Sequence, residues 1–141
     1  MRNLGHLPIS HINLSVVFVL CLLCACSGRS AQAQTTSVYK KITAETAYQM
    51  MQKPNAFILL DVRTEQEFQE KHIAGAILIP VQELEKRAAT ELPDKNGVIF
   101  VYCRSGVRSS NAAKILIEKG YTQVFDIGGI IDWPYETVNG N

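Results

Sequence analysis

The sequence predicts an α/β domain with a mainly parallel sheet, and two observations lead to this fold class. Residues 57–60 (Phe-Ile-Leu-Leu) and 98–102 (Val-Ile-Phe-Val-Tyr) are continuous apolar runs, which are typical of strands covered on both faces. Helix-like segments separate such runs, so strands and helices alternate along the chain. Because a crossover through a helix returns the chain parallel to the preceding strand, this alternation favours a parallel sheet.

Apolar patterns and end signals place the elements in chain order. Thr43 can cap the first helix, Thr64 and Glu67 form a capping box, and Gly120 suits the left-handed position after the last helix. We expect strands at residues 40–42, at 57–60, after Gly75, at 98–102 and at 124–125. We expect helices after residues 43 and 64, at 82–89 and at 109–119. Their inward residues are expected to be Ala47, Met50, Met51, Phe68, Leu84, Ala112, Ala113, Ile115, Leu116 and Ile117.

Residues 1–25 are expected to be a signal peptide. A short basic region contains Arg2, and the nearly apolar run at 12–25 is shorter than the roughly 20 residues that span a bilayer. Leu23-Cys24-Ala25-Cys26 is similar to a bacterial lipoprotein box, which predicts lipidation of Cys26. The alternative is ordinary secretion with cleavage after Ala33, at the small-x-small pattern of residues 31–33.

The rest of the chain divides into a tether and a domain. Residues 26–37 are small and polar, which predicts a flexible tether to a domain at residues 38–141. We therefore expect a protein exported to the bacterial cell envelope, periplasmic and anchored to the outer membrane by a lipid on Cys26. Ser27 follows that cysteine, as in the outer-membrane sorting pattern. No other membrane contact is expected.

Residue counts exclude several functional classes. The chain has 14 Lys and Arg against 13 Asp and Glu and no arginine-rich run, so nucleic-acid binding is not expected. After export, Cys103 is the only free thiol left, and no disulfide can form within the domain. His72 is the one histidine after residue 26, and one histidine with one cysteine cannot build a closed zinc site. No metal or other cofactor is expected.

The predicted site is the loop around Cys103, between the strand at 98–102 and the helix at 109–119. N–H groups of such a loop and of the first helical turn converge on one point, where the helix dipole adds partial positive charge. This field lowers the pKa of a cysteine and makes its thiolate a nucleophile. Arg104 and Arg108 add full charges, and Gly106 permits a tight loop. The hypothesis requires amides directed at the sulfur and a sulfur that solvent can reach.

Three other residues have alternative interpretations. Asp61 could be a general acid, but a carboxylate paired with Arg63 at a strand end more commonly organises the turn. His72 could form a Cys/His dyad, although the loop can activate the thiolate without a base. Gly128-Gly129 predicts a flexible turn, and Trp133 is expected to be a core or lid residue near the loop.

Four segments together resemble the single-domain rhodaneses. They are Asp61-Val62-Arg63, the run at 72–76, the run at 103–109, and Gly128-Gly129 followed by Trp133. The resemblance covers about residues 38–138 and implies a three-layer domain with a five-stranded parallel sheet and helices on both faces. It also implies a thiosulfate sulfurtransferase with Cys103 as the nucleophile. The implied substrate-binding residues are Arg104, Ser105, Gly106, Val107 and Arg108.

The implied reaction moves sulfur through a covalent intermediate. The N–H groups of residues 104–108 would enclose the sulfur, and both arginines would attract a small anionic donor such as thiosulfate. The Cys103 thiolate would attack the outer sulfur of the donor, and the resulting persulfide would pass that sulfur to cyanide or to a thiol.

Three alternative functions remain open, one of which is sulfur relay or thiol-redox work in the envelope, with the persulfide as cargo for another protein. Cysteine phosphatases and arsenate reductases are similar, but they place five residues between cysteine and arginine, whereas four separate Cys103 from Arg108. The smaller ring suits a sulfur atom better than a tetrahedral phosphate. A non-catalytic interaction module is the third alternative; many rhodanese-like domains lack the cysteine, which this chain keeps.

Overall fold

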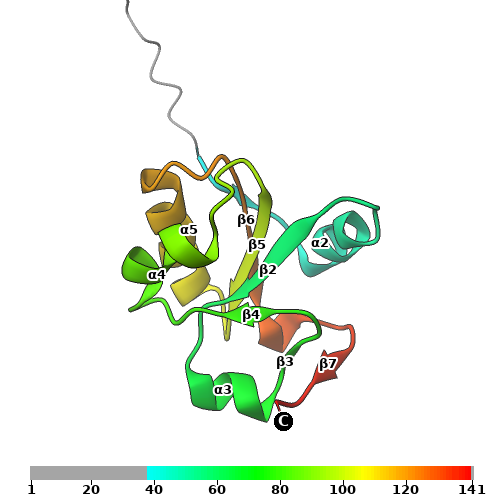
Figure 1. Cartoon of the computed structure of the whole chain (residues 1–141). Helices are drawn as coiled ribbons and strands as arrows, with labels where there is room; N and C mark the ends of the chain where they lie inside the picture. Colours follow the sequence, from blue (N-terminus) through cyan, green and yellow to red (C-terminus); the bar gives the residue numbers. More distant parts are fainter. Residues whose placement is uncertain (1–37, 141) are drawn as a thin grey trace, which may run out of the picture. The chain divides into compact units, whose positions relative to one another are not determined.

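Five parallel strands form the central sheet, in the order β1-β6-β5-β2-β4. The computed structural model describes residues 38–140, which Figure 1 shows in colour. The strands are β1 (Lys40–Lys41), β2 (Phe57–Asp61), β4 (Ile77–Leu78), β5 (Val98–Cys103) and β6 (Gln123–Gly129). The expected parallel five-stranded sheet is confirmed. The predicted signal peptide at 1–25 and the tether at 26–37 lie outside the described residues.

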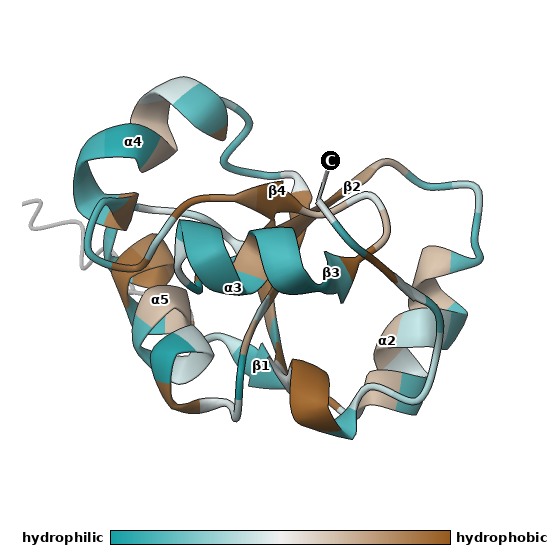
Figure 2. Cartoon of the chain, turned by 90° about the horizontal axis from the view of Figure 1, so that it is seen from below, coloured by the Kyte–Doolittle hydropathy of each residue, from teal (hydrophilic) through white to brown (hydrophobic). Residues whose placement is uncertain are grey.

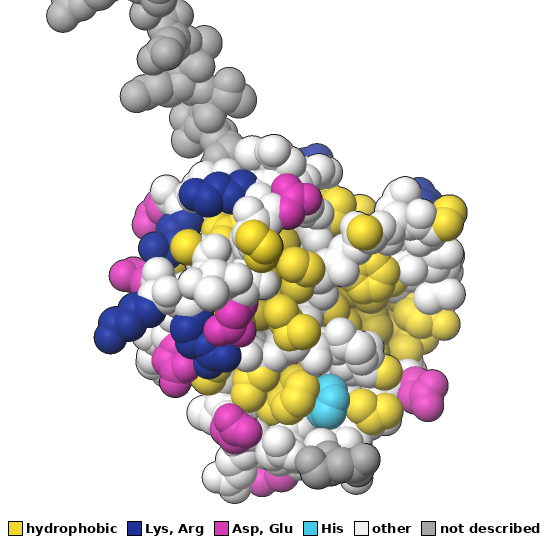
Figure 3. All heavy atoms as spheres, in the orientation of Figure 1, with side chains coloured by type: hydrophobic (Ala, Val, Ile, Leu, Met, Phe, Trp, Pro, Cys, Tyr) yellow, Lys and Arg dark blue, Asp and Glu magenta, His cyan; other side chains and the backbone are white. Residues whose placement is uncertain are grey.

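The sheet is the middle of three layers. Helices α4 (Leu84–Glu91) and α5 (Val107–Glu118) cover one face, and α2 (Ala44–Met51) with the short helix η1 (Ile130–Asp132) covers the other. Figure 2 shows the hydrophilic outer surfaces of α4 and of α3 (Glu65–Glu70). In Figure 3 charged side chains gather over α4 and α5, and apolar ones show over β2 and β4. No helix within residues 38–140 is long and apolar enough to cross a membrane.

Central strand β5 is apolar along its length because its side chains contribute to two hydrophobic cores, one on each face of the sheet. Ile99 and Val101 belong to the core beneath α4 and α5, while Phe100 and Tyr102 belong to the core beneath α2. All four are at most 1% exposed. The continuous apolar run was therefore a correct signal for a central strand covered on both faces. Cys103 ends this strand and lies on the α4–α5 side.

The structure corrects several local expectations. Helix α5 begins at Val107, two residues before the expected start, and Gly128-Gly129 belongs to β6 instead of a flexible turn. Phe68 enters neither core; it is half-buried and stacks on His72 with ring centroids 3.8 Å apart. The short segments β3 (His72–Ile73) and β7 (Thr137–Val138) form an antiparallel pair that the sequence did not predict.

Asp61 organises the turn after β2, as the sequence favoured. Its carboxylate accepts from the Arg63 backbone N–H at 2.9 Å and from Arg63 Nη2 at 2.6 Å. Arg63 Nη2 also donates to the Lys71 carbonyl at 2.6 Å, which fixes the end of α3. Both side chains of the pair are almost fully buried. Because a buried charge is costly unless paired and hydrogen-bonded, the two residues form one structural unit.

Glu67 joins α3 to the start of α5. It completes the expected capping box by accepting from the Thr64 backbone N–H at 3.0 Å. The same carboxylate accepts two hydrogen bonds from Arg108, each 2.7 Å long. This bidentate pair lowers the pKa of Glu67 to about 2; the Arg108 hydrogen bond is the largest cause, and burial opposes it.

Strand β6 passes directly beneath the loop that follows Cys103. Gly129 is the register partner of Cys103. A Cβ atom at Gly129 would lie 2.3 Å from the Arg104 carbonyl oxygen and 2.6 Å from the Ser105 Cα. The backbone of Gly129 has an ordinary φ of −112°, so glycine is required here by close approach and not by conformation.

The Glu67–Arg108 pair should make stability depend on pH in acid. The folded pKa lies below the ordinary value of 4.5, so the pair stabilises the fold above pH 4.5 and loses this contribution as pH falls toward 2. Glu67→Gln should lose about 1–3 kcal/mol at pH 7, since both side chains are mostly buried. Urea unfolding between pH 2 and pH 7 measures this effect.

The matched control is Glu65→Gln, an exposed first-turn carboxylate for which no arginine partner is found within residues 38–140. An acid transition that persists unchanged in Glu67→Gln would contradict the assignment.

Gly129→Ala should displace the loop after Cys103. The added methyl group overlaps backbone atoms that cannot rotate away, so we expect a loss of about 1–3 kcal/mol or more. The alkylation rate of Cys103 should change with it, as read by mass spectrometry. Gly97→Ala is the control, because Gly97 lies outside the left-handed region and the nearest atoms its Cβ would meet belong to Asp94, at 3.1 Å or more. A Gly129→Ala variant with wild-type stability and alkylation would show that β6 does not position the loop.

Candidate active site

Cys103 stands at the junction of the central strand and a helix. It is the last residue of β5, residues 104–106 form the loop, and α5 starts at Val107. This is the strand–loop–helix arrangement expected from the sequence. Gly106 caps the helix with φ of +97°, a left-handed conformation that side chains disfavour. The loop therefore closes within three residues and turns the first amides of α5 toward the end of β5.

Those amides act on the Cys103 sulfur. The Gly106 backbone N–H donates to Sγ at 3.1 Å, and Ser109 Oγ lies 3.8 Å from Sγ. Burial is the largest single influence and raises the pKa of Cys103. The backbone N–H groups of Ser109, Gly106 and Ser105, together with the Ser109 hydroxyl, outweigh it, so the pKa is lowered overall. The site thus favours a thiolate through hydrogen bonds from backbone N–H groups and the Ser109 hydroxyl.

The sulfur is less accessible than the hypothesis required. Cys103 is only 1% exposed, so the expectation of a solvent-accessible thiol is wrong for this conformation. The physical reason is the tight loop, which closes over β6 at Gly129. Arg104, Ser105 and Val107 are exposed, so the sulfur lies one layer below the surface.

The two loop arginines have different surroundings. Arg108 is held by Glu67, which is the main cause of its raised pKa; the charge of Cys103 contributes less. Arg104 is exposed and forms no ion pair with residues 38–140. Of the two arginines predicted to attract an anion, Arg104 is therefore exposed and Arg108 is already bound to Glu67.

Two grooves border the loop. One of about 790 Å³ is bounded by residues 41–46 on one side and by Ser105 and Gly106 on the other, with β6 at its base. A second, of about 280 Å³, has more cationic than acidic side chains. Its lining is Arg63, Glu67, Glu70, Lys71, Arg104, Ile130 and Ile131. Because Arg104 borders the second groove, an anion that approaches the loop there meets unpaired positive charge.

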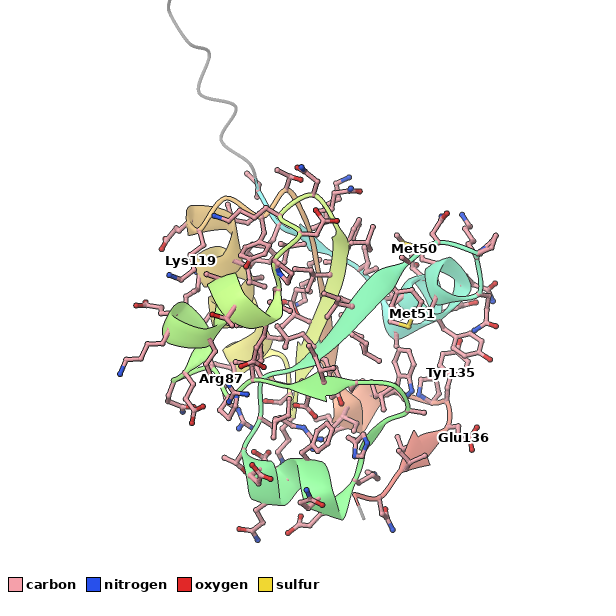
Figure 4. All side chains as sticks on the ribbon, in the orientation of Figure 1. Met50, Met51, Arg87, Lys119, Tyr135 and Glu136 are labelled. Carbon is pink, nitrogen blue, oxygen red and sulfur yellow. The ribbon has the colours of Figure 1, made fainter. Side chains whose placement is uncertain are left out.

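His72 and Trp133 are not part of the site. His72 donates from Nδ1 to the Phe68 carbonyl at 2.9 Å and, within residues 38–140, has no hydrogen bond to Cys103. Trp133 packs edge-on against Tyr48 and Tyr135, beside α2. Figure 4 labels Tyr135 beside Met51 of that helix. The described residues also contain no cluster of His, Cys, Asp and Glu that could hold a metal ion.

Sequence reasoning missed two buried polar residues beside the sulfur, Ser109 and Asp126. Both are 0% exposed, and Ser109 Oγ lies 2.6 Å from Asp126 Oδ1. The signal in the sequence was weak: a serine at the start of a helix and an aspartate at the end of a short apolar strand. Only the pairing of β5 with β6 brings Asp126 toward the first turn of α5.

Known proteins share this fold. The family of rhodanese-like domains matches residues 43–134. Thiosulfate sulfurtransferase PspE of Escherichia coli is 44% identical over 81 residues, which cover 57% of this chain and 78% of PspE. Thiosulfate sulfurtransferase GlpE of Haemophilus influenzae is 38% identical over 96 residues, which cover 67% of this chain and 88% of GlpE.

A solved structure of a relative has the same fold. A rhodanese with anions from E. coli superposes with a TM-score of 0.58 at 44% identity and covers 60% of this chain and 100% of its own. The parallel sheet and the helices on both faces are thus shared features, and the chain belongs to the family of rhodanese-like domains.

Proposed function

We propose that this protein is a sulfurtransferase that moves sulfane sulfur from a small anionic donor, such as thiosulfate, to cyanide or a thiol. The observation that carries the proposal is the Gly106 N–H directed at Cys103 Sγ at 3.1 Å, in a loop that lowers the thiol pKa. A thiolate held by neutral amides is a nucleophile, and the same amides can hold the terminal sulfur of a persulfide.

The reaction has two displacement steps. The Cys103 thiolate attacks the outer sulfur of thiosulfate and forms a new S–S bond. The bond between that sulfur and the sulfonate breaks, and sulfite leaves with the electron pair. Cyanide or a thiolate then attacks the outer sulfur of the persulfide, takes it as thiocyanate or as a new persulfide, and restores the Cys103 thiolate. No change in net oxidation state and no cofactor is needed.

The proposed donor fits the charges at the loop. Thiosulfate is a dianion, and Arg104 presents an exposed positive charge in the groove lined by Arg63 and Lys71. Arg108 would act second: a sulfonate that competes with Glu67 for its guanidinium would loosen the contact between α3 and α5. Val107 is the apolar residue of the predicted binding loop and is 77% exposed, so it can contact the donor or acceptor.

The names of the relatives and the length of the Cys103 loop support the proposal that this protein is an enzyme. PspE and GlpE are named thiosulfate sulfurtransferases, and they are 44% and 38% identical to this chain. Four residues separate Cys103 from Arg108, so the ring is smaller than that of the cysteine phosphatases. A non-catalytic interaction module needs neither a lowered thiol pKa nor directed amides, and this chain has both.

We also propose that the domain acts outside the cytoplasm. The support is the sequence pattern alone: an apolar segment at residues 12–25 followed by the lipoprotein-like box that ends at Cys26. In this proposal the tether at 26–37 attaches the domain to the outer membrane, and cleavage after Ala33 would give a free periplasmic protein.

Intact-mass spectrometry of the full chain, recovered from the cell envelope, tests the chemistry. Thiosulfate should add the mass of one sulfur atom, and cyanide should remove it, because Cys103 carries the transferred sulfur. Cys103→Ser should show no gain. The starting mass also reports whether Cys26 carries a diacylglycerol group. A wild-type protein that never gains sulfur would leave only the interaction-module alternative.

The arginines should differ in kinetic effect. Arg104→Ala should raise the KM for thiosulfate about tenfold with a smaller change in kcat, because Arg104 is exposed and unpaired within residues 38–140. Arg108→Ala should also lower kcat, since it leaves the Glu67 charge uncompensated near the thiolate.

Steady-state sulfite release measures both variants. Adding Glu67→Gln to Arg108→Ala should restore part of the lost kcat, while Arg104→Lys, which keeps the charge, should retain most of the affinity. Full activity of Arg108→Ala would remove its assigned role.

A further inference from the structure

Ser109 and Asp126 form a hydrogen-bonded chain that starts at the nucleophile. The Cys103 thiol can donate to Ser109 Oγ at 3.8 Å, within the range for sulfur, and Ser109 Oγ lies 2.6 Å from Asp126 Oδ1. The Gly128 backbone N–H also donates to Oδ1, at 3.0 Å. Cys103, Ser109 and Asp126 come from β5, α5 and β6, three elements that meet at this point.

The direction of the Ser109 proton follows from its acceptors. The hydroxyl has one proton and three nearby acceptors: Asp126 Oδ1 at 2.6 Å, the Gly106 carbonyl at 3.0 Å and the Gly128 carbonyl at 3.3 Å. A carboxylate oxygen at the shortest distance is the strongest of the three. Ser109 therefore donates to Asp126, and its lone pairs are free to receive the proton of the Cys103 thiol.

Asp126 lacks the partners that a permanent buried charge requires. It is 0% exposed, and among residues 38–140 its Oδ2 has no hydrogen-bond partner and no cation forms an ion pair with it. The other buried aspartate, Asp61, has hydrogen bonds to both carboxylate oxygens and a cationic partner, all from Arg63. A buried carboxylate without a counter-charge is costly, and uptake of a proton removes that cost.

We propose that Asp126 receives the proton of Cys103 through Ser109 when the thiolate forms. The S–H proton passes to Ser109 Oγ while the Ser109 proton passes to Asp126 Oδ1. One proton leaves sulfur, one arrives on the carboxylate, and Ser109 keeps one, which now points at the thiolate. The negative charge moves from an oxygen pair with few partners to a sulfur that the loop amides surround.

The burial of Cys103 explains why an internal proton acceptor would help to form the thiolate. A thiol that is 1% exposed has little direct contact with bulk water, so an internal acceptor gives its proton a shorter path. Ser109 touches the reacting sulfur, whereas Asp126 acts through Ser109 and is a positioning residue that also stores the proton. The inference rests on the proposed nucleophilic role of Cys103.

Other charged groups surround the hydrogen bonds that link Cys103, Ser109 and Asp126, and all of them stay in place in Asp126→Asn and Ser109→Ala. They are Arg104 and Arg108 of the loop and α5, Glu67 of α3, Asp61 at the end of β2, Arg63 after it, Tyr102 of β5, Lys41 of β1 and Asp132 of η1. A difference between wild type and Asp126→Asn therefore reports Asp126 itself.

The test is the pH dependence of Cys103 alkylation by iodoacetamide, a neutral reagent, followed on the Cys103 peptide of the full chain by mass spectrometry. Asp126→Asn keeps the shape and the acceptor for Gly128 but cannot take the proton. With a relay, the wild-type rate should vary only weakly between pH 5 and 7. Asp126→Asn should react about tenfold more slowly at pH 6 and gain about tenfold per pH unit.

Faster alkylation of Asp126→Asn than of wild type would overturn the proposal. If Asp126 were a permanently charged bystander, removing its charge would favour the thiolate, and Asp126→Asn would react faster than wild type. An unchanged rate would equally exclude the relay. Asp132→Asn, an exposed acid on the neighbouring groove, should leave the profile unchanged as a control for charge alone.

Ser109→Ala provides the second variant, should Asp126→Asn fail to fold. It breaks the chain between sulfur and carboxylate and should lower the rate at pH 6 at least as much, whereas a wild-type profile would exclude the relay. The double variant should be no slower than Ser109→Ala, because both changes remove the same proton pathway.

Alkylation requires no sulfur transfer, so a relay without persulfide formation would contradict only the proposed function. Persulfide formation with an unaffected Asp126→Asn profile would contradict only the relay.

Discussion

The convergence of backbone amides on the Cys103 sulfur is the constraint on which the rest of the site depends. A parallel strand that ends in a three-residue loop before a helix has few ways to close, and Gly106 supplies the left-handed residue that closes it. The N–H of that same residue then reaches Sγ at 3.1 Å. Because backbone donors carry no titratable charge, they favour the thiolate at every pH and need no reorganisation when charge appears on sulfur.

The tight loop has a consequence for access and proton transfer. Closing the loop over Gly129 of β6 buries Cys103, so the features that make the thiolate favourable also separate it from water. Burial alone would raise the thiol pKa, and the amides reverse this effect. The site therefore combines a sulfur whose lowered pKa favours the thiolate with a buried environment, in which Ser109 links that sulfur to Asp126.

Electrostatic balance around the loop is set by pairs of residues. Arg63 neutralises Asp61 in the interior, and Arg108 neutralises Glu67 nearer the surface. Each pair ties α3 to another part of the fold: the first through the Lys71 carbonyl, the second through the start of α5. Arg104 keeps a positive charge with no ion-pair partner within residues 38–140, and the Glu67–Arg108 contact links the start of α5 to α3.

The sequence by itself determined the parallel sheet, the position of Cys103 at a strand end and the helix caps at Thr43 and Thr64. These features depend on residues close together in the chain, namely apolar runs, capping pairs and a glycine in a tight loop. Only the tertiary structure decided that Glu67 binds Arg108, that Gly129 must lack a side chain, and that Asp126 lies against Ser109. These contacts join residues from 17 to 41 positions apart, in elements brought together by strand pairing and helix packing. Local pattern carries no information about which distant side chains will meet.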